Sequence, residues 1–381
     1  MNPYYSEEKE AFRQKVRSFA EQEIKPLAAE LDTNEIFSTE LSQKMGQAGL
    51  YGIDLDKKYG GQGLDTQSYI IAVEEIARVD GSQAATMAAH NSLGVSPIYN
   101  YGTEEQKQKL LPSLLNGDKL WAFGLTEENA GSDARGVETS ATKTAEGWEL
   151  NGTKRYITNG SSEMMAGITV LAQTGEKNGK ASYSTFILDR NTSGFSTKRT
   201  LGKMMWRASD TAEIKIDKCL VSDNDLLGEQ DKGLSQMLKT LDSGRLSIAA
   251  MGLGLAQGAF ELALAYSKER QQFGKAIHNF QAVQFKLADM DLQIELARNL
   301  LYKACWLKDN GQPFGKEAAM AKLYCSEVAK NVSDEGVQIF AGAGLFQGAD
   351  IERFYRDHRI LRIGEGTSEI LKLVISRHLG V

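Results

Sequence analysis

The chain has 381 residues, 41% of them hydrophobic and 25% charged, and its 44 basic and 50 acidic residues give a formal net charge of −6. This length predicts two or three domains at roughly 150 residues each, every one large enough to bury its own core. The 3 cysteines are too few for a disulfide framework, and none lies at ligand spacing from one of the 4 histidines, so we expect no metal site. The acidic balance, without a basic block, argues against nucleic acid as a partner.

The first ten residues, MNPYYSEEKE, have no apolar core and are too acidic for an organelle transit peptide. No later stretch reaches about 18 uncharged apolar residues, the length that a membrane span needs. We therefore expect a soluble cytoplasmic protein that does not cross a membrane.

The first third of the chain predicts helices. Apolar residues recur at helical spacing between residues 7 and 116, for example at Val16 and Ile24. Thr103 followed by Gln106 is the pattern of a capped helix start. We expect an N-terminal helical domain over residues 1–117.

The next hundred residues predict strands. Short β-rich runs occur at Leu120–Thr126, Trp148–Leu150, Tyr156–Thr158, Ile168–Ala172, Ser184–Leu188 and Ala212–Ile216. Asn151-Gly152 is the strongest hairpin signal in the chain, because both residues tolerate the positive φ of a primed turn. We expect a central antiparallel β barrel or sandwich over residues 118–226.

Long helices return beyond residue 227. One apolar stripe steps by four and three residues through Val283, Leu287, Met290, Ile294, Ala297, Leu301 and Ala304. Gly311-Gln312-Pro313 ends this helix, another begins near Lys316, and a last one begins near Thr367. We expect a C-terminal four-helix bundle over residues 227–381, so the fold class is α+β and multidomain.

Three glycines in this region, Gly252, Gly254 and Gly258, superficially resemble a dinucleotide-binding loop. No strand precedes them, and their spacing is GxGxxxG. They fall within a helical pattern, so we interpret them as sites where helices approach closely.

The most informative segment is Leu125–Asp133, LTEENAGSD, where a strand ends in a small loop with hydroxyls and exposed backbone N–H groups. It resembles the TEPxAGSD signature of the acyl-CoA dehydrogenases, and Asn151–Gly160, NGTKRYITNG, resembles their NGxKxWITN strand. Further matches follow in the family's order at Leu241–Arg245, Glu269–Gly274, Gln338–Gly342, Tyr355–Asp357 and Glu365–Ile370. The resemblance covers nearly the whole chain and is closest to the short-chain, butyryl-CoA branch.

The resemblance implies that the chain binds FAD. Tyr156, where the family usually has Trp, would pack on the isoalloxazine ring, and Thr158 would reach its N5 edge. The remaining cofactor residues implied near the ring and its phosphates are Phe123, Leu125, Thr126 and Ser132. A second group would hold the rest of an FAD across a subunit interface: Arg270, Phe273, Gln338, Gly342, Thr367 and Glu369. The resemblance therefore also implies a homo-oligomer, a tetramer built as a dimer of dimers.

Glu365 is the implied catalytic base. Glycines flank it, so the backbone can turn its carboxylate inward, and burial would raise its pKa toward neutral, as removal of a thioester α-proton requires. Some branches carry the base at the position of Gly244, which cannot act as one. Ser132, Asp242, Arg245 and Gly366 are the implied substrate-binding residues.

Three departures from the family pattern bear on the rigidity of the flavin loop and on the substrate. Glu128 and Asn129 replace a proline and a small residue in the flavin loop. Gly364 stands where an aromatic residue often precedes the base, which would open the pocket wall. Ala84 replaces the arginine that binds a second carboxylate, which argues against dicarboxylic substrates.

These features favour an FAD-dependent short-chain acyl-CoA dehydrogenase that passes electrons to an electron-transfer flavoprotein. A dehydrogenase for branched or medium-length acyl-CoA is the alternative. A flavin oxidase and a non-catalytic acyl-CoA-binding homologue are further readings, since fold alone does not prove function.

Overall fold

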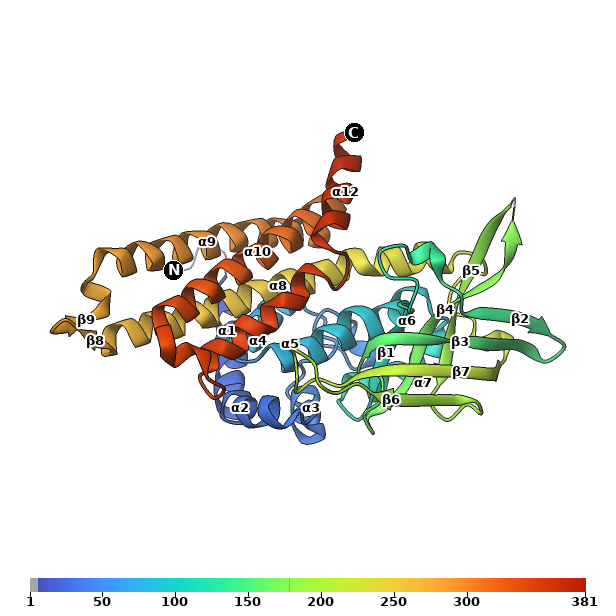
Figure 1. Ribbon diagram of the computed structural model, residues 1–381. Coiled ribbons are helices and arrows are strands. Elements are labelled where there is room, and N and C mark those ends of the chain that lie inside the picture. Colours follow the sequence, from blue (N-terminus) through green and yellow to red (C-terminus); the bar gives the residue numbers. More distant parts are fainter. Residues whose placement is uncertain (1–5, 178) are drawn as a thin grey trace.

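The computed structural model describes residues 6–177 and 179–381 and has three regions, with a β domain at one end of a long helical body (Figure 1). The first region contains α1 (Glu7–Phe19), α2 (Lys25–Asn34), α3 (Thr39–Gln47), α4 (Thr66–Ala77), α5 (Gly81–Ala88), α6 (Ser96–Tyr101) and α7 (Glu104–Leu115). The capping box at Thr103 and Gln106 is present at the start of α7, as the sequence predicts.

The β domain is one seven-stranded sheet. Its strands are β1 (Leu120–Gly124), β2 (Ser140–Thr144), β3 (Gly147–Thr158), β4 (Met165–Lys177), β5 (Lys180–Asp189), β6 (Phe195–Arg199) and β7 (Thr211–Val221). The order is β1-β4-β2-β3-β7-β6, and β5 pairs with β4. The sheet is mixed and not wholly antiparallel as expected, because β4 runs parallel to both β1 and β2.

The hairpin prediction at Asn151-Gly152 is wrong. Both residues lie inside the single strand β3, and the turn between β2 and β3 comes earlier, before Gly147. The β3–β7 register shifts between Leu150 and Gly152, and a Cβ on Gly152 would lie 2.3 Å from the Thr139 hydroxyl. Close packing at a β-bulge therefore explains this glycine, which sequence alone does not distinguish from a turn.

The C-terminal region consists of α8 (Gly233–Glu269), α9 (Gln281–Asp309), α10 (Gly315–Phe340), α11 (Asp350–Asp357) and α12 (Ser368–Leu379). A small hairpin of β8 (Gln271–Gln272) and β9 (Lys275–Ala276) follows α8. The long helices α8, α9 and α10 pack side by side, and α4 packs against α8 and α9. The bundle thus shares one hydrophobic core with the N-terminal helices.

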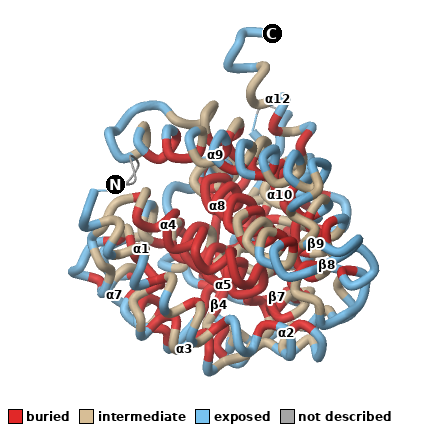
Figure 2. Tube along the Cα trace, turned by 90° about the vertical axis from the view of Figure 1, so that its left-hand side faces the viewer, coloured by how far each residue is buried: buried red, intermediate tan, exposed pale blue. Residues whose placement is uncertain are grey.

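Helix α8 is the centre of this core (Figure 2). A Cβ on Gly254 would lie 2.3 Å from the Glu74 carbonyl oxygen, and one on Gly252 would lie 2.8 Å from that of Cys325. These glycines therefore let α4 and α10 approach α8 closely, as the sequence predicts. By length and composition α8 could cross a membrane, but most of its apolar stretch is buried inside the protein, as in the core helix of a soluble bundle.

Candidate active site

A strand irregularity in the β domain presents Tyr156. The β3–β7 register shifts between Lys154 and Ile157, and Tyr156 has φ 59°. This bulge leaves Tyr156 67% exposed, while its neighbour Ile157 is buried. The backbone N–H of Arg155 donates to the Thr126 carbonyl at 2.9 Å, so the loop after β1 lies beside this part of β3. An exposed aromatic ring and the predicted flavin loop thus share one surface.

Under this surface lies a buried ion pair. Lys154 is fully buried, and its Nζ donates to Glu127 Oε1 at 2.6 Å and to the Leu171 carbonyl at 2.8 Å. Glu127 also accepts from the backbone N–H groups of Glu138 and Thr139. Burial lowers the pKa of Lys154 to about 8 against the opposing effect of Glu127. These bonds tie the loop that carries Leu125 and Thr126 to the sheet.

The other ring-side predictions fall in the same region. Leu125 is buried and Phe123 half-buried in a small apolar cluster that includes Met237 of α8. Thr158 is half-buried at the end of β3, and Ser132 is exposed in the loop. The structure therefore brings the predicted ring-side residues together on the β domain.

Glu365 lies in the loop before α12. Its φ is 55° and that of Gly366 is 102°, so two successive residues adopt the left-handed conformation, which is costly for a glutamate. Thr367 caps α12 by accepting the Ile370 N–H at 3.3 Å. This turn directs the Glu365 carboxylate toward α8, where a Cβ on Gly244 would lie 2.1 Å from Glu365 Oε2. Gly244 therefore makes room for the carboxylate.

The electrostatics of Glu365 suit a base. Its Oε2 is buried and has no hydrogen-bond partner among the described residues. Burial raises the pKa of Glu365 to about 7, and the cations Lys322 and Arg245 oppose that rise. A carboxyl group near neutrality exists as carboxylate and acid in comparable amounts at pH 7, as proton abstraction requires.

The two cations near Glu365 come from different helices. Arg245 of α8 pairs with Asp242 at 2.5 Å. Lys322 of α10 is fully buried, and its Nζ donates to the Gly366 carbonyl at 2.6 Å. Gly366 and Arg245, both predicted to bind substrate, thus lie beside the predicted base.

Four of the residues predicted to hold the rest of an FAD, Arg270, Phe273, Gln338 and Gly342, lie away from Tyr156. Arg270 ends α8 next to the β8–β9 hairpin, and Phe273 at the hairpin turn is 93% exposed. The stacking of Tyr266 on Phe340, with ring centroids 4.1 Å apart, brings the ends of α8 and α10 together, so exposed Gln338 and Gly342 lie at this end too. The β domain lies at the opposite end of the molecule (Figure 1). These residues do not meet Tyr156 within one chain.

Thr367 and Glu369 belong to the same predicted group of cofactor residues, but they do not lie near Arg270. Both are at the start of α12, immediately after the Glu365 loop. Glu369 is exposed, and its position in the first helical turn is also explained by the helix dipole.

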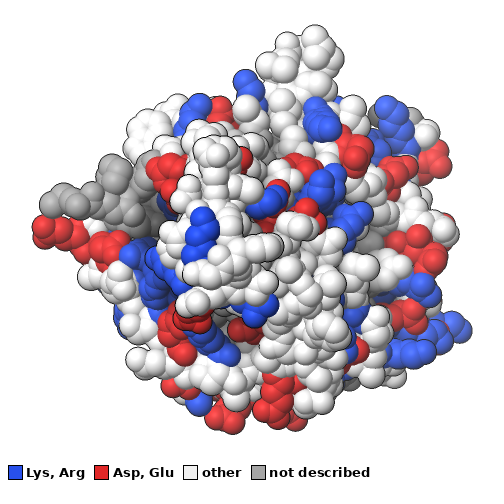
Figure 3. All heavy atoms as spheres, turned by 60° about the vertical axis from the view of Figure 1, so that its left-hand side comes forward, with Lys and Arg blue, Asp and Glu red and all other residues white. Residues whose placement is uncertain are grey.

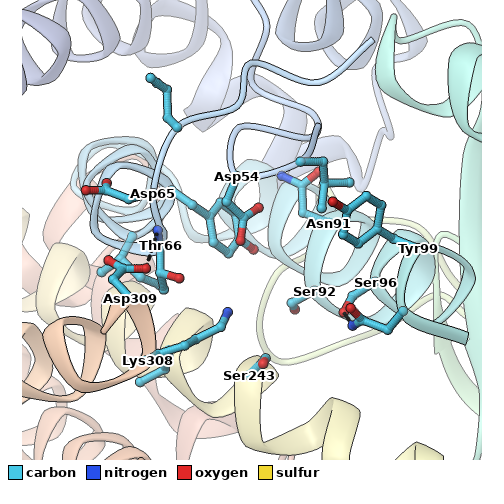
Figure 4. Close-up of a pocket in the computed structure, with 16 residues that line it drawn as sticks. Asp54, Asp65, Thr66, Asn91, Ser92, Ser96, Tyr99, Ser243, Lys308 and Asp309 are labelled. Carbon is cyan, nitrogen blue, oxygen red and sulfur yellow. Dashed lines mark hydrogen bonds between the residues drawn. The ribbon is translucent and has the colours of Figure 1, made fainter. Parts of the chain in front are cut away.

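A polar cavity of about 250 Å³ lies between α4, α6, α8 and the end of α9. Asp54 and Lys308 point into it from opposite walls, and Ser92 and Ser96 line it as well (Figure 4). The Tyr69 hydroxyl, on its wall, lies 3.1 Å from that of Ser247. The apolar side chains of Leu55, Leu64, Ile70 and Leu246 also line it, and this mixed lining does not by itself assign the cavity to an acyl chain.

The residues present fit a flavin. The exposed ring of Tyr156 offers a stacking face, and the adjoining loop offers backbone groups and hydroxyls. The helix–sheet–helix architecture, the exposed aromatic ring on the sheet and the glutamate with a buried, unpaired Oε2 beside the bundle are features that a flavin-dependent dehydrogenase acting on thioesters would use.

Three family models match the chain in order. They are the acyl-CoA dehydrogenase N-terminal domain over residues 6–118, the middle domain over residues 122–219 and the C-terminal domain over residues 231–380. The short-chain specific acyl-CoA dehydrogenase of Clostridium acetobutylicum is 46% identical over 97% of each chain. The chain therefore belongs to the acyl-CoA dehydrogenase family and is an oxidoreductase of that class.

Solved structures similar to this chain include members of the same family. Butyryl-CoA dehydrogenase from Megasphaera elsdenii has a TM-score of 0.96 at 41% identity and covers 100% of both chains. A chain in a structure of the electron transferring flavoprotein of Acidaminococcus fermentans has a TM-score of 0.96 at 42% identity, with 100% and 99% coverage. The acyl-CoA dehydrogenase of Bacillus anthracis, solved with FAD, has a TM-score of 0.92 at 33% identity, over 98% of this chain and 67% of that one.

Sequence reasoning missed the two buried lysines. Lys322 interrupts an otherwise small and apolar helical face formed by Ala318, Ala329 and Cys325. Lys154 follows Leu150 by four residues in β3, and both are buried. A charged residue at a position whose periodicity predicts burial was the available signal, since such a residue needs a specific partner.

Proposed function

We propose that this protein is an FAD-dependent dehydrogenase that converts a short-chain acyl-CoA to the trans-2-enoyl-CoA, with Glu365 as the base that removes the α-proton. The observation that supports this most directly is the buried, unpaired Oε2 of Glu365, with a pKa near 7, in a space kept open by Gly244. A structural glutamate would be expected to have a partner at that depth.

In this mechanism the α-proton of the thioester passes to Glu365 Oε2. The backbone N–H of Glu365 polarises the thioester carbonyl, which stabilises the negative charge that develops on its oxygen. The flavin ring would be held by Tyr156, Thr158, Leu125 and Thr126. Bound FAD supplies the acceptor for the β-hydrogen, which leaves as hydride.

The names of the similar proteins support a short acyl chain. The alternative, a branched or medium-length acyl group, is supported by Gly364, because a Cβ there would meet nothing closer than 3.7 Å. A Cβ there would make only ordinary van der Waals contact with Ile360, so close packing does not require the glycine, and the missing side chain next to the base favours a bulkier acyl group.

We further propose that the electron acceptor is an electron-transfer flavoprotein and that the chain works as a homotetramer. The similarity to a chain in an electron transferring flavoprotein structure supports the first proposal. Within one chain, the predicted cofactor residues around Arg270 lie at the opposite end of the molecule from those around Tyr156. This separation supports the second proposal, since a neighbouring chain could bring the two sets together. On the face shown in Figure 3, basic and acidic side chains are interspersed, with no extended basic patch.

The test is turnover with a panel of acyl-CoA thioesters, using an artificial electron acceptor and identifying the product by mass. We expect the highest kcat/KM with butyryl-CoA and a product lighter by two hydrogens. Highest kcat/KM with a branched or longer thioester would support the alternative. No oxidation of any saturated thioester by the FAD-loaded protein would contradict the proposed function.

A further inference from the structure

Helix α10 contributes two anchors to the loop that carries Glu365. Lys322 Nζ donates to the Gly366 carbonyl, just after Glu365, at 2.6 Å. The Ser326 hydroxyl shares its proton between the Lys322 carbonyl of its own helix, at 2.6 Å, and the Leu361 carbonyl, before the loop, at 3.0 Å. Ser326 and Lys322 are one helical turn apart, so a single face of α10 holds both sides of the turn. Between these anchors Glu365 and Gly366 adopt their two positive φ angles. Such a conformation persists only where surrounding contacts hold it.

The charge of Lys322 has no partner of its own. Among the described residues no carboxylate lies within 4.0 Å of its Nζ. Arg245, the other cation near Glu365, is already paired with Asp242. A buried ammonium without a close counter-ion is costly. The largest compensating charge is the Glu365 carboxylate, which acts against the burial that lowers the pKa of Lys322 to about 8.

The other ionisable groups facing this loop come from two further elements. Tyr69 of α4 interacts electrostatically with Glu365, and burial raises its pKa so that it stays neutral at pH 7. Exposed Glu369 of α12 interacts weakly with Lys322. Lys322 is therefore the cation near Glu365 that no other carboxylate neutralises at close range.

We propose that Lys322 is a positioning residue for the catalytic base: its ammonium group fixes the Gly366 carbonyl, holds Glu365 in its left-handed turn with the carboxylate toward Gly244, and favours the charged form of that carboxylate. This inference rests on the proposed role of Glu365. It assigns to α10 a function in the reaction that acts through the loop carrying the base.

The test compares Lys322→Met, which removes both the charge and the donor, with Lys322→Arg, which retains both. Lys330→Met is the matched control, because Lys330 is exposed on the same helix. The first readout is hydrogen–deuterium exchange in the peptide that covers residues 361–371 of the FAD-loaded protein. The second is the pH dependence of the rate at which butyryl-CoA reduces the flavin.

We expect Lys322→Met to exchange faster in this peptide alone. Its rate–pH profile should move about one unit to higher pH, because loss of a nearby cation raises the pKa of a carboxyl group, so the rate at pH 6 falls about tenfold. Lys322→Arg should restore much of both properties, and Lys330→Met should match the wild type.

Wild-type exchange and an unshifted pH profile in Lys322→Met would overturn the proposal. Faster exchange with an unshifted profile would also overturn it, since Lys322 would then be merely structural. If Lys322→Met does not fold, Lys322→Gln decides, because it retains a donor for the Gly366 carbonyl and removes only the charge. A profile moved to higher pH in the folded, FAD-loaded Gln variant supports the proposal, and a wild-type profile contradicts it. If wild-type protein oxidises no acyl-CoA, the proposed function fails, whereas the exchange result still tests the anchoring.

Discussion

The two halves of the site are each built on a fully buried lysine, but the two lysines have different surroundings. Lys154 in the β domain lies 2.6 Å from Glu127, whose carboxylate is bonded on several sides. Lys322 in the bundle donates to a backbone carbonyl, and the carboxylate near it, Glu365, keeps one oxygen without a partner. A satisfied pair gives rigidity, whereas an unsatisfied carboxylate is available for chemistry.

The largest effect should come from breaking the satisfied pair. Glu127→Ala leaves the Lys154 ammonium buried with carbonyl oxygens alone, which should cost about 3–5 kcal/mol of stability. Urea unfolding measures this loss. Glu128→Ala, at the exposed neighbouring position, should stay within about 0.5 kcal/mol of the wild type. Equal losses in the two variants would show that the buried pair has no special role.

A smaller effect, on rate alone, should follow from filling the space at Glu365. Gly244→Ala puts a Cβ 2.1 Å from the present position of Oε2, so the carboxylate must move. A displacement of about 1 Å at a reacting group can cost about 100-fold, and we expect a loss of that order in flavin reduction by butyryl-CoA. Helix stability should not fall, because alanine is the better helix former.

Gly315→Ala is the control for that substitution, since its nearest neighbour would be 3.8 Å away. Stopped-flow reduction rates near those of the wild type are expected for it. A Gly244→Ala enzyme that is as fast as the wild type would show that the position of Oε2 does not matter.

The smallest effect is a pH dependence of stability. The pKa of Glu365 is raised from 4.5 to about 7 in the folded protein, so the folded state holds a proton that the unfolded chain releases. Stability attributable to this group therefore falls as pH rises from about 4.5 to 7, by about 1–3 kcal/mol. Glu365→Gln removes this loss, so its stability relative to the wild type should increase between pH 5 and pH 8. A constant difference would contradict the raised pKa.

The sequence predicts the helical and β regions because their periodicities differ clearly, as at Val16 and Ile24 in one and along Ile168–Ala172 in the other. It fails at Asn151-Gly152, because a bulge and a turn favour the same residues. The parallel pairing of β1 with β4 depends on contacts between distant segments, which local patterns do not encode.

For the candidate site, motif resemblance predicts Glu365 and Tyr156, and the structure adds how each is presented. The bulge that exposes Tyr156 arises from pairing with β7, and the depth of Glu365 arises from packing of its loop on α8 and α10. Lys154 and Lys322 could have been noticed as charges at buried positions, but their partners come from other segments of the chain. Only the folded arrangement shows that one is paired with a carboxylate and the other is not.

The most direct test of Glu365 as the base is an anaerobic titration of the FAD-loaded wild type and Glu365→Gln with butyryl-CoA, following the visible flavin band. We predict that the wild type bleaches and that the variant, which keeps its yellow flavin and its fold, does not. Bleaching of Glu365→Gln at the wild-type rate would contradict the account.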